Sequence, residues 1–167
     1  MKFSLVITII FVVFIPISVY ILYNSLIKDA SITRPDNSVA KPSDSGVTLP
    51  LANGKSIDVE NFLALPEVTP AAYNTNDYFL GNTFEDVQTA EYIVTFDAET
   101  KYFNIILLKK PFAASRLSVE AYLKKTLNLS EAQMCGLDYT VSVPGYVDEA
   151  ASGADYRFSF CPGSVKL

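Results

Sequence analysis

The chain contains no histidine and only two cysteines. Histidine is the commonest general base in enzymes, the usual partner of serine and cysteine nucleophiles, and a frequent ligand of transition metals. Its absence excludes the Ser-His and Cys-His catalytic systems, and two thiols alone provide too few ligands for a structural zinc site. The GxSxG motif, the phosphate-binding loop and the Rossmann fingerprint are missing as well. We therefore expect a protein that is not an enzyme and that uses no cofactor or metal.

Basic residues are also scarce. Thirteen Lys and Arg stand against eighteen Asp and Glu, which gives a net charge of −5. Nucleic acids and anionic lipid surfaces require a basic face, so we expect no nucleic-acid partner. Nine carboxylates and one lysine fall between Lys55 and Glu99, whereas six basic residues and one glutamate fall between Lys101 and Lys125. This distribution favours two solvated faces of different charge, and the alternative is a partner surface with electrostatic steering.

One long apolar run without charge, Phe3–Tyr23, lies near the start of the chain. As a helix with a rise of about 1.5 Å per residue it would extend roughly 30 Å, the thickness of the hydrocarbon core of a bilayer. A cleaved signal peptide has a shorter apolar region and a small-x-small cleavage site, but the residues after Ser18 are bulky. We expect residues 1–27 to form a retained transmembrane helix in contact with membrane lipid.

The charges around this run do not define its orientation, because Lys2 precedes it and Lys28 and Arg34 follow it. A short tail before the helix is typical of a signal-anchor, and a pair of distant cysteines is typical of an exported domain. We expect a single-pass protein of the cell membrane, with the N-terminus cytoplasmic and the C-terminal domain extracytoplasmic. The exported part carries about −6, because all eighteen acidic but only twelve of the thirteen basic residues follow the run.

Residues 28–56 are predicted to be a flexible linker, because they are rich in Ser, Pro, Asn and Gly and show no apolar period. Residues 57–167 then form the predicted extracytoplasmic domain. Its beginning, Ile57–Leu63, is predicted as a short strand or a helical turn, and residues 67–81 as a loop.

The clearest local patterns lie in the second half of the chain. Alternating apolar residues predict a hairpin, helical spacing with a capping box predicts two helices, and alternation predicts two further strands. The expected elements are strands over 91–96 and 101–109, helices over 112–128 and 130–136, and strands over 139–143 and 156–160. Arg116, Lys124 and Lys125 are expected to flank the apolar stripe of the first helix or to face solvent. The order β-β-α-α-β-β predicts an α+β domain of two layers, with both helices on one face of an antiparallel sheet.

The two cysteines, Cys135 and Cys161, are expected to form a structural disulfide. A redox-active pair usually has the spacing Cys-x-x-Cys, which this pair does not have. An exported protein lies in an oxidising compartment, where such bonds persist. Two free buried thiols are the alternative.

Three groups of residues are candidate sites without a strong motif. Asp97 with Glu99, and Asp148 with Glu149, would supply oxygen ligands for calcium, but neither pair has the spacing of an EF-hand loop. Ser115 and Ser118 lie near lysines, which permits a Ser-Lys nucleophile. Tyr73, Tyr78 and Phe79 are expected to pack against the core, and an exposed aromatic platform for a ligand is the alternative.

A series of short motifs resembles one family across the exported domain. These motifs are Asn61-Phe62…Pro66, Tyr78-Phe-Leu-Gly, Phe103-Asn-Ile, Leu107-Leu-Lys-Lys-Pro, Glu120-Ala-Tyr-Leu, Leu129-Ser…Cys135, Tyr139-x-Val-x-Val-Pro and Phe158-Ser-Phe-Cys-Pro-Gly. They are similar to short, single-anchor membrane proteins of ultra-small, Patescibacteria-type bacteria, whose members have no assigned activity. The resemblance implies that Cys135, Pro144 and residues 158–163 belong to the scaffold. The late loop Asp148–Gly153 departs from the Gly-rich loop that such relatives often have.

These observations favour a non-catalytic domain that binds a protein partner in the cell envelope, as part of a secretion, pilus or surface assembly. The layout of anchor, linker and domain and the lack of acid–base groups support this hypothesis. A binding module for a wall polymer or small ligand is the alternative, and it depends on the aromatic platform. A hydrolase that uses carboxylates or a Ser-Lys pair is the least favoured, because it requires a deep cleft with convergent polar groups.

Overall fold

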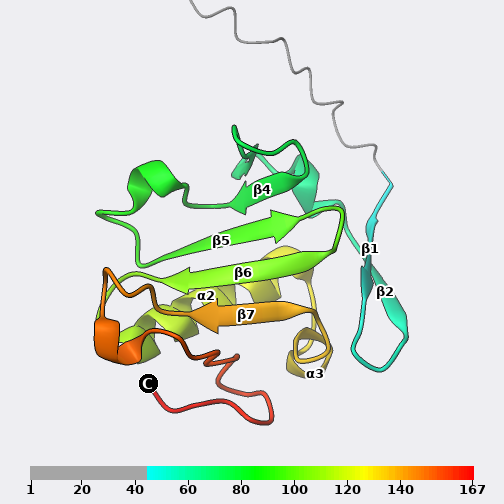
Figure 1. Cartoon of the computed structure of the whole chain (residues 1–167). Helices are drawn as coiled ribbons and strands as arrows, with labels where there is room; N and C mark the ends of the chain where they lie inside the picture. Colours follow the sequence, from blue (N-terminus) through cyan, green and yellow to red (C-terminus); the bar gives the residue numbers. More distant parts are fainter. Residues whose placement is uncertain (1–44) are drawn as a thin grey trace, which may run out of the picture. The chain divides into compact units, whose positions relative to one another are not determined.

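The computed structural model describes residues 45–167, which are drawn in colour in Figure 1. The predicted anchor of residues 1–27 and the predicted linker as far as residue 44 lie outside the described residues. Within residues 45–167, no helix combines the length and the apolar character that a membrane span requires.

A five-stranded sheet with the strand order β3-β4-β5-β6-β7 forms the centre of the domain. Its strands are β3 (Val68–Pro70), β4 (Asp77–Leu80), β5 (Tyr92–Asp97), β6 (Tyr102–Leu107) and β7 (Tyr139–Ser142). The predicted hairpin is confirmed, because β5 and β6 pair antiparallel from Tyr92 opposite Leu107 to Asp97 opposite Tyr102. The predicted strand at 139–143 is confirmed as β7.

The sheet is mixed, and the expected purely antiparallel arrangement is wrong at one pair. β6 and β7 run parallel, whereas the other three neighbouring pairs are antiparallel. The two helices lie between β6 and β7 in the chain, and they carry it back so that β7 starts where β6 starts. A helical crossover of this kind is the usual way to join parallel neighbours. Because the other three pairs are antiparallel and the helices are grouped in one part of the chain, the predicted α+β class is confirmed.

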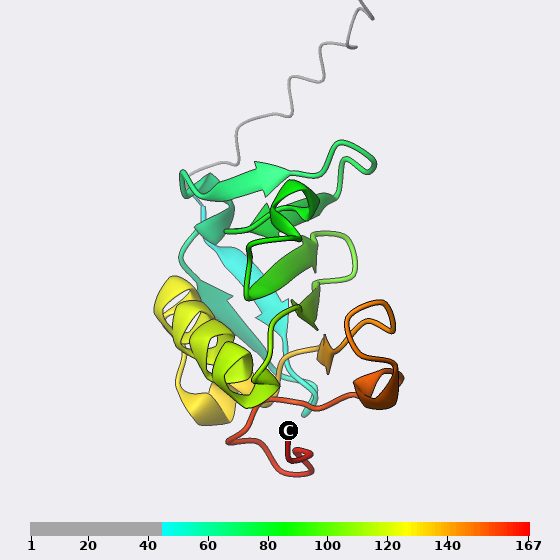
Figure 2. The same ribbon diagram turned by 90° about the vertical axis from the view of Figure 1, so that its left-hand side faces the viewer.

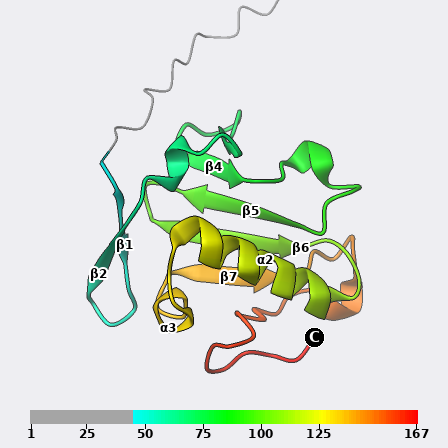
Figure 3. The ribbon, with the colours of Figure 1, turned by 180° about the vertical axis from the view of Figure 1, so that it is seen from behind.

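The helix α2 (Phe112–Leu127) lies along one face of the sheet, as Figures 2 and 3 show. It ends at Asn128, whose left-handed conformation (φ 51°) closes the last turn. The short helix α3 (Glu131–Met134) follows. Its N-cap is Ser130, which forms with Gln133 the capping box that the sequence predicted.

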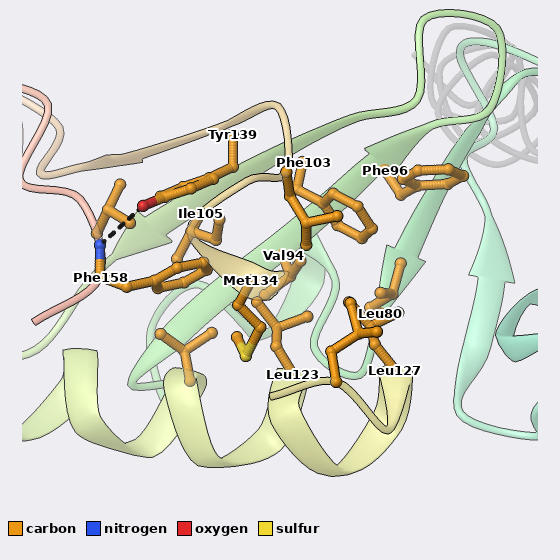
Figure 4. Close-up of a cluster of buried hydrophobic side chains, with 14 of the residues drawn as sticks. Leu80, Val94, Phe96, Phe103, Ile105, Leu123, Leu127, Met134, Tyr139 and Phe158 are labelled. Atoms are coloured by element: carbon orange, nitrogen blue, oxygen red, sulfur yellow. Dashed lines mark hydrogen bonds between the residues drawn. The ribbon is translucent and has the colours of Figure 1, made fainter. Parts of the chain in front are cut away.

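The main core fills the space between α2 and the sheet (Figure 4). Alternate strand residues point into it, since successive side chains of a strand point to opposite faces. Its fully buried members include Leu80, Val94, Phe96, Phe103, Ile105, Leu123, Leu127 and Met134. Each such side chain contributes about 1.5–3 kcal/mol when removed from water, so this layer provides most of the stabilisation of the domain.

The domain begins earlier than Ile57, so the end of the predicted linker is corrected. Strands β1 (Val47–Pro50) and β2 (Ser56–Val59) form an antiparallel hairpin, and the 3₁₀ turn η1 (Phe62–Ala64) follows it. Leu49 and Phe62 are buried in the main core. The turn residues of this hairpin gave the segment the composition of a linker, although apolar residues alternate on either side of the turn.

Two further predictions about strands are wrong. The predicted loop over residues 67–81 contains β3 and β4, both of which are very short. The predicted last strand over 156–160 is irregular, because Arg157 has a positive φ of 55°, outside the extended region. The segment makes one main-chain hydrogen bond to β7, in which the N–H of Tyr156 donates to the oxygen of Val141. The N–H of Val141 donates to the side-chain carboxylate of Asp155, so no regular strand pairing follows.

Candidate functional site

The face of the sheet opposite α2 is the most distinctive surface of the domain, and we call it the open face. Figure 1 views it with α2 behind the sheet. Four residues lie side by side across it in register, namely Phe79 of β4, Thr95 of β5, Asn104 of β6 and Thr140 of β7. The last three are partly exposed. Short segments cover only its margins, where Val87 and Val147 pack against a small second cluster around Phe79 and Ile93.

Three aromatic rings form a cluster at the β4 end of the open face. The rings of Tyr73 and Phe84 are stacked, with centroids 6.2 Å apart and planes at 26°. Phe79 lies edge-on to both, with centroids 6.3 Å from Tyr73 and 4.9 Å from Phe84. Phe79 is buried, whereas Tyr73 is 61% exposed and Phe84 is 48% exposed. We call these three residues the aromatic cluster.

Local hydrogen bonds hold both segments that carry the exposed rings. Phe84 begins the 3₁₀ turn η2 (Phe84–Asp86), which is fixed by a capping box between Thr83 and Asp86. The amide of Asn82 donates to the oxygen of Tyr92 over 2.9 Å and ties this turn to β5. The loop that carries Tyr73 is closed where the N–H of Ala71 donates to the oxygen of Asp77 over 2.7 Å. These hydrogen bonds, from side chains and from the main chain, therefore preorganise the aromatic cluster.

The core packing expected for Tyr73, Tyr78 and Phe79 is found for two of the three, so the alternative platform of all three residues is not formed. Tyr78 and Phe79 are neighbours in β4 and point to opposite faces, and both are buried. Tyr78 belongs to the main core under α2, and Phe79 supports the open face. Only Tyr73 of the three is exposed. Its partner is Phe84, which the sequence analysis missed because the two come together only through the tertiary fold.

Carboxylates lie beside the aromatic cluster. Asp77 is opposite Asp97 in the pairing of β4 with β5, and the side-chain amide of Asn76 donates to Glu99 over 3.1 Å. Partial burial and the nearby Asp77 carboxylate together raise the pKa of Tyr73 above the ordinary tyrosine value.

The candidate calcium ligands are engaged in local structure. Asp97 accepts hydrogen bonds from the N–H groups of Glu99 and Thr100 and from the Thr100 hydroxyl at 2.7 Å. Asp148 caps the 3₁₀ turn η3 (Glu149–Ala151) and pairs with Lys110 over 2.5 Å. Within residues 45–167, no group of three Cys, Asp or Glu side chains lies close enough to hold a metal ion. The structure therefore does not bring the two predicted pairs into a common site.

The substitution Thr100→Val is expected to raise the pKa of Asp97 toward the ordinary value, because the Thr100 hydroxyl is the main cause that holds this pKa low. The depressed pKa means that the folded state favours the charged carboxylate. This contribution to stability is present above the pH at which an unfolded aspartate titrates, near 4, and is lost as the pH falls through the folded pKa. Carboxyl-carbon NMR titration measures the shift. The control Thr89→Val, in another turn, should leave it unchanged, and equal pKa values in the wild type and Thr100→Val would refute the assignment.

The predicted serine nucleophiles do not meet a base. The hydroxyl of Ser115 is buried and donates to the main-chain oxygen of Lys109 over 2.7 Å. Ser118 is exposed on α2. Among the described residues, no hydrogen bond joins either hydroxyl to a lysine amine.

A buried charged pair, missed by the sequence analysis, holds the C-terminal segment against α2. Arg116 is only 7% exposed, so of its two expected positions, beside the apolar stripe or facing solvent, the second is wrong. Its guanidinium donates to the main-chain oxygens of Tyr156 (3.3 Å) and Val165 (2.7 Å). One turn later Glu120, 4% exposed, accepts from the N–H and the hydroxyl of Ser159.

The contact between Ser159 and Glu120 is the nearest approach to a nucleophile–base pair. It lies at a depression of about 340 Å³ that is also lined by Leu117 and Lys124. Both carboxylate oxygens of Glu120 are taken by Ser159, one of them by the main-chain N–H. Glu120 therefore has a structural role. Its carboxylate holds the main chain of Ser159 and is not free to accept a proton from a substrate.

Cys135 and Cys161 are brought together as the sequence predicted. Their sulfurs lie 1.96 Å apart and their Cα atoms 5.4 Å apart. The pair joins the end of α3 to the irregular C-terminal segment. Together with the contacts of Arg116 and Glu120, this disulfide holds the segment that the sequence predicted to be a strand.

Comparison of the chain with protein-family models, with curated protein sequences and with solved structures gives no match in any of the three.

Proposed function

We propose that this chain is a single-pass membrane protein whose folded domain lies outside the cytoplasm and binds another protein of the cell envelope without catalysing a reaction. The aromatic cluster is the observation that carries the proposal. Two large rings that stack on each other in water and rest on a buried third ring form an exposed apolar patch on a rigid support. Aromatic residues are enriched at the centres of protein interfaces, and such patches are typical of interaction sites.

The location in the membrane rests on the sequence. The apolar run Phe3–Tyr23 supports an anchor, and the paired Cys135 and Cys161 support an oxidising, extracytoplasmic compartment. The resemblance to single-anchor proteins of Patescibacteria-type bacteria supports the same layout. A domain held at the surface by an anchor is suited to a secretion, pilus or surface assembly, where the partner is also in the envelope.

The arrangement of polar groups supports a binding role over catalysis. The candidate residues for calcium and for a serine nucleophile serve turns and caps, and Glu120 clamps the main chain of Ser159. A second candidate function is a binding module for a wall polymer or small ligand, because the stacked faces of Tyr73 and Phe84 also suit a flat ligand. A hydrolase is the least favoured.

Affinity purification of the full chain from detergent extracts of its native membranes is expected to recover one defined envelope protein. The control is a chain of residues 1–44 only, which keeps the predicted anchor and lacks the domain. The proposal predicts that the partner is recovered with the full chain and not with the control. Recovery of the same abundant proteins with both chains would contradict the proposal, and recovery of wall glycan without protein would favour the second candidate.

A further inference from the structure

We propose that the aromatic cluster and the carboxylates beside it bind an extended, arginine-containing segment of the partner protein. This inference rests on the proposed function and adds the surface and the chemistry of the partner. The charge of the surrounding segment and the geometry of the exposed rings both support it.

The part of the chain that builds the aromatic cluster is strongly acidic. Between Ser56 and Thr100 there is no lysine or arginine, and there are nine carboxylates: Asp58, Glu60, Glu67, Asp77, Glu85, Asp86, Glu91, Asp97 and Glu99. Asp77 acts on the Tyr73 ring, and Glu85 is exposed in the same turn as Phe84. Among the described residues, the ion pairs are those of Lys110, Arg116 and Lys124, and none of them involves these nine carboxylates. The acidic segment, which includes Asp77 and Glu85, therefore keeps negative charge that no described residue neutralises in an ion pair.

The exposed rings add a preference for arginine among the cations. A guanidinium is planar and weakly hydrated, so it stacks on an aromatic face and at the same time donates hydrogen bonds to carboxylates at its edge. Tyr73 and Phe84 supply the aromatic surface, and the nearest acidic residues are Asp77, which acts on Tyr73, and Glu85, which follows Phe84 in the same turn. A lysine ammonium offers only a point charge to the same surface.

The same charges disfavour other occupants. A nucleic acid or an anionic membrane would be repelled by Asp77 and Glu85. A neutral wall polymer would stack on the rings but would gain nothing from the nine carboxylates. A basic segment would instead be attracted by the same carboxylates.

The test is a titration of the full chain, in detergent micelles, against fluorescein-labelled peptides followed by fluorescence anisotropy. The probe is a Gly-Ser peptide of about twelve residues with evenly spaced arginines, which spans roughly 40 Å when extended. Matched peptides carry lysine or glutamate in the same places, and a soluble wall oligosaccharide serves as the neutral competitor. The variants are Tyr73→Ala, Phe84→Ala and Glu85→Gln. The control variant is Tyr146→Ala, which removes a ring that is 75% exposed in the loop after β7.

We expect the arginine peptide to bind more tightly than the lysine peptide, and the glutamate peptide not to bind. Tyr73→Ala and Phe84→Ala should each weaken the arginine peptide by about fivefold, Glu85→Gln by about twofold, and Tyr146→Ala should have no effect. Added salt should weaken binding further. Lack of binding by the arginine peptide, equal affinity in Tyr73→Ala, or competition by the neutral oligosaccharide would overturn the inference. If affinity purification still recovers one envelope protein in such a case, the proposed function stands and only the chemistry assigned to its partner fails.

Discussion

Replacement of Glu120 with alanine is expected to lower the free energy of unfolding by about 3 kcal/mol. The substitution leaves the Arg116 guanidinium buried without its carboxylate neighbour, whose oxygen lies 3.8 Å from Nε. It also removes the acceptor for the N–H and the hydroxyl of Ser159. Burial of an unpaired charge and of an unsatisfied N–H is among the most costly changes in a protein interior. Chemical denaturation of the full chain in mild detergent, followed by the near-ultraviolet tyrosine signal, measures the loss.

The matched control is Glu131→Ala. Glu131 also forms an ion pair, with Lys124 over 2.9 Å, but both side chains are about half exposed. An exposed pair contributes only about 0–1 kcal/mol, so this variant should unfold close to the wild type. An equal, small loss in both variants would show that Glu120 is solvated in solution and that the clamp on the C-terminal segment is not formed.

Loss of the bond between Cys135 and Cys161 is expected to destabilise the domain by roughly 3–4 kcal/mol. The two residues are 26 positions apart, and a cross-link over such a loop removes much of the conformational entropy of the unfolded chain. Unfolding of the oxidised wild type should therefore be compared with the same protein after reduction. The double variant with serine at both positions should match the reduced wild type and should not respond to reductant.

Thiol labelling of the unfolded chain measures whether Cys135 and Cys161 are paired in the cell. Protein taken from intact cells should label at Cys135 and Cys161 only after reduction, because an extracytoplasmic domain lies in an oxidising compartment. Full labelling without reductant would argue against the disulfide and against the proposed location together.

The parts of the fold that the sequence predicted correctly are those with strong local signals. The hairpin of β5 and β6 has alternating apolar residues around a polar turn, and α2 has several apolar residues at helical spacing. The capping box at Ser130 defines the start of α3 through two reciprocal hydrogen bonds. Each of these patterns lies within one helix or one hairpin, so these elements can be recognised without the rest of the fold.

The elements that the sequence did not predict depend on distant contacts. β3 has only three residues, and the four residues of β4 do not alternate between buried and exposed, so both strands are recognised only through the pairing of β4 with β5. The segment after Asp155 alternates as a strand would, but Arg116 and Glu120 hold its main chain through side chains from α2. A charged pair one helical turn apart resembles an ordinary solvated pair, and only the fold shows that it is buried.

The candidate site was also predicted only in part. The sequence identified Tyr73 and the acidic segment around it, because composition and residue type can be read without the fold. It placed Tyr73 with Tyr78 and Phe79, whereas the structure places Tyr73 with Phe84 across the loops on either side of β4. Tyr78 and Phe79 point to opposite faces because they are successive residues of β4, and the sequence did not reveal this strand.

The proposed function requires that the aromatic cluster contacts a protein partner, and photo-crosslinking detects such a contact. A photoreactive phenylalanine analogue is placed at Tyr73 in the full chain, in native membranes, and a matched protein carries it at the exposed Tyr146. We expect one discrete protein adduct from position 73 after illumination and no such adduct from position 146. If position 73 gives no adduct, or if both positions give the same adducts, the aromatic cluster is not the binding site.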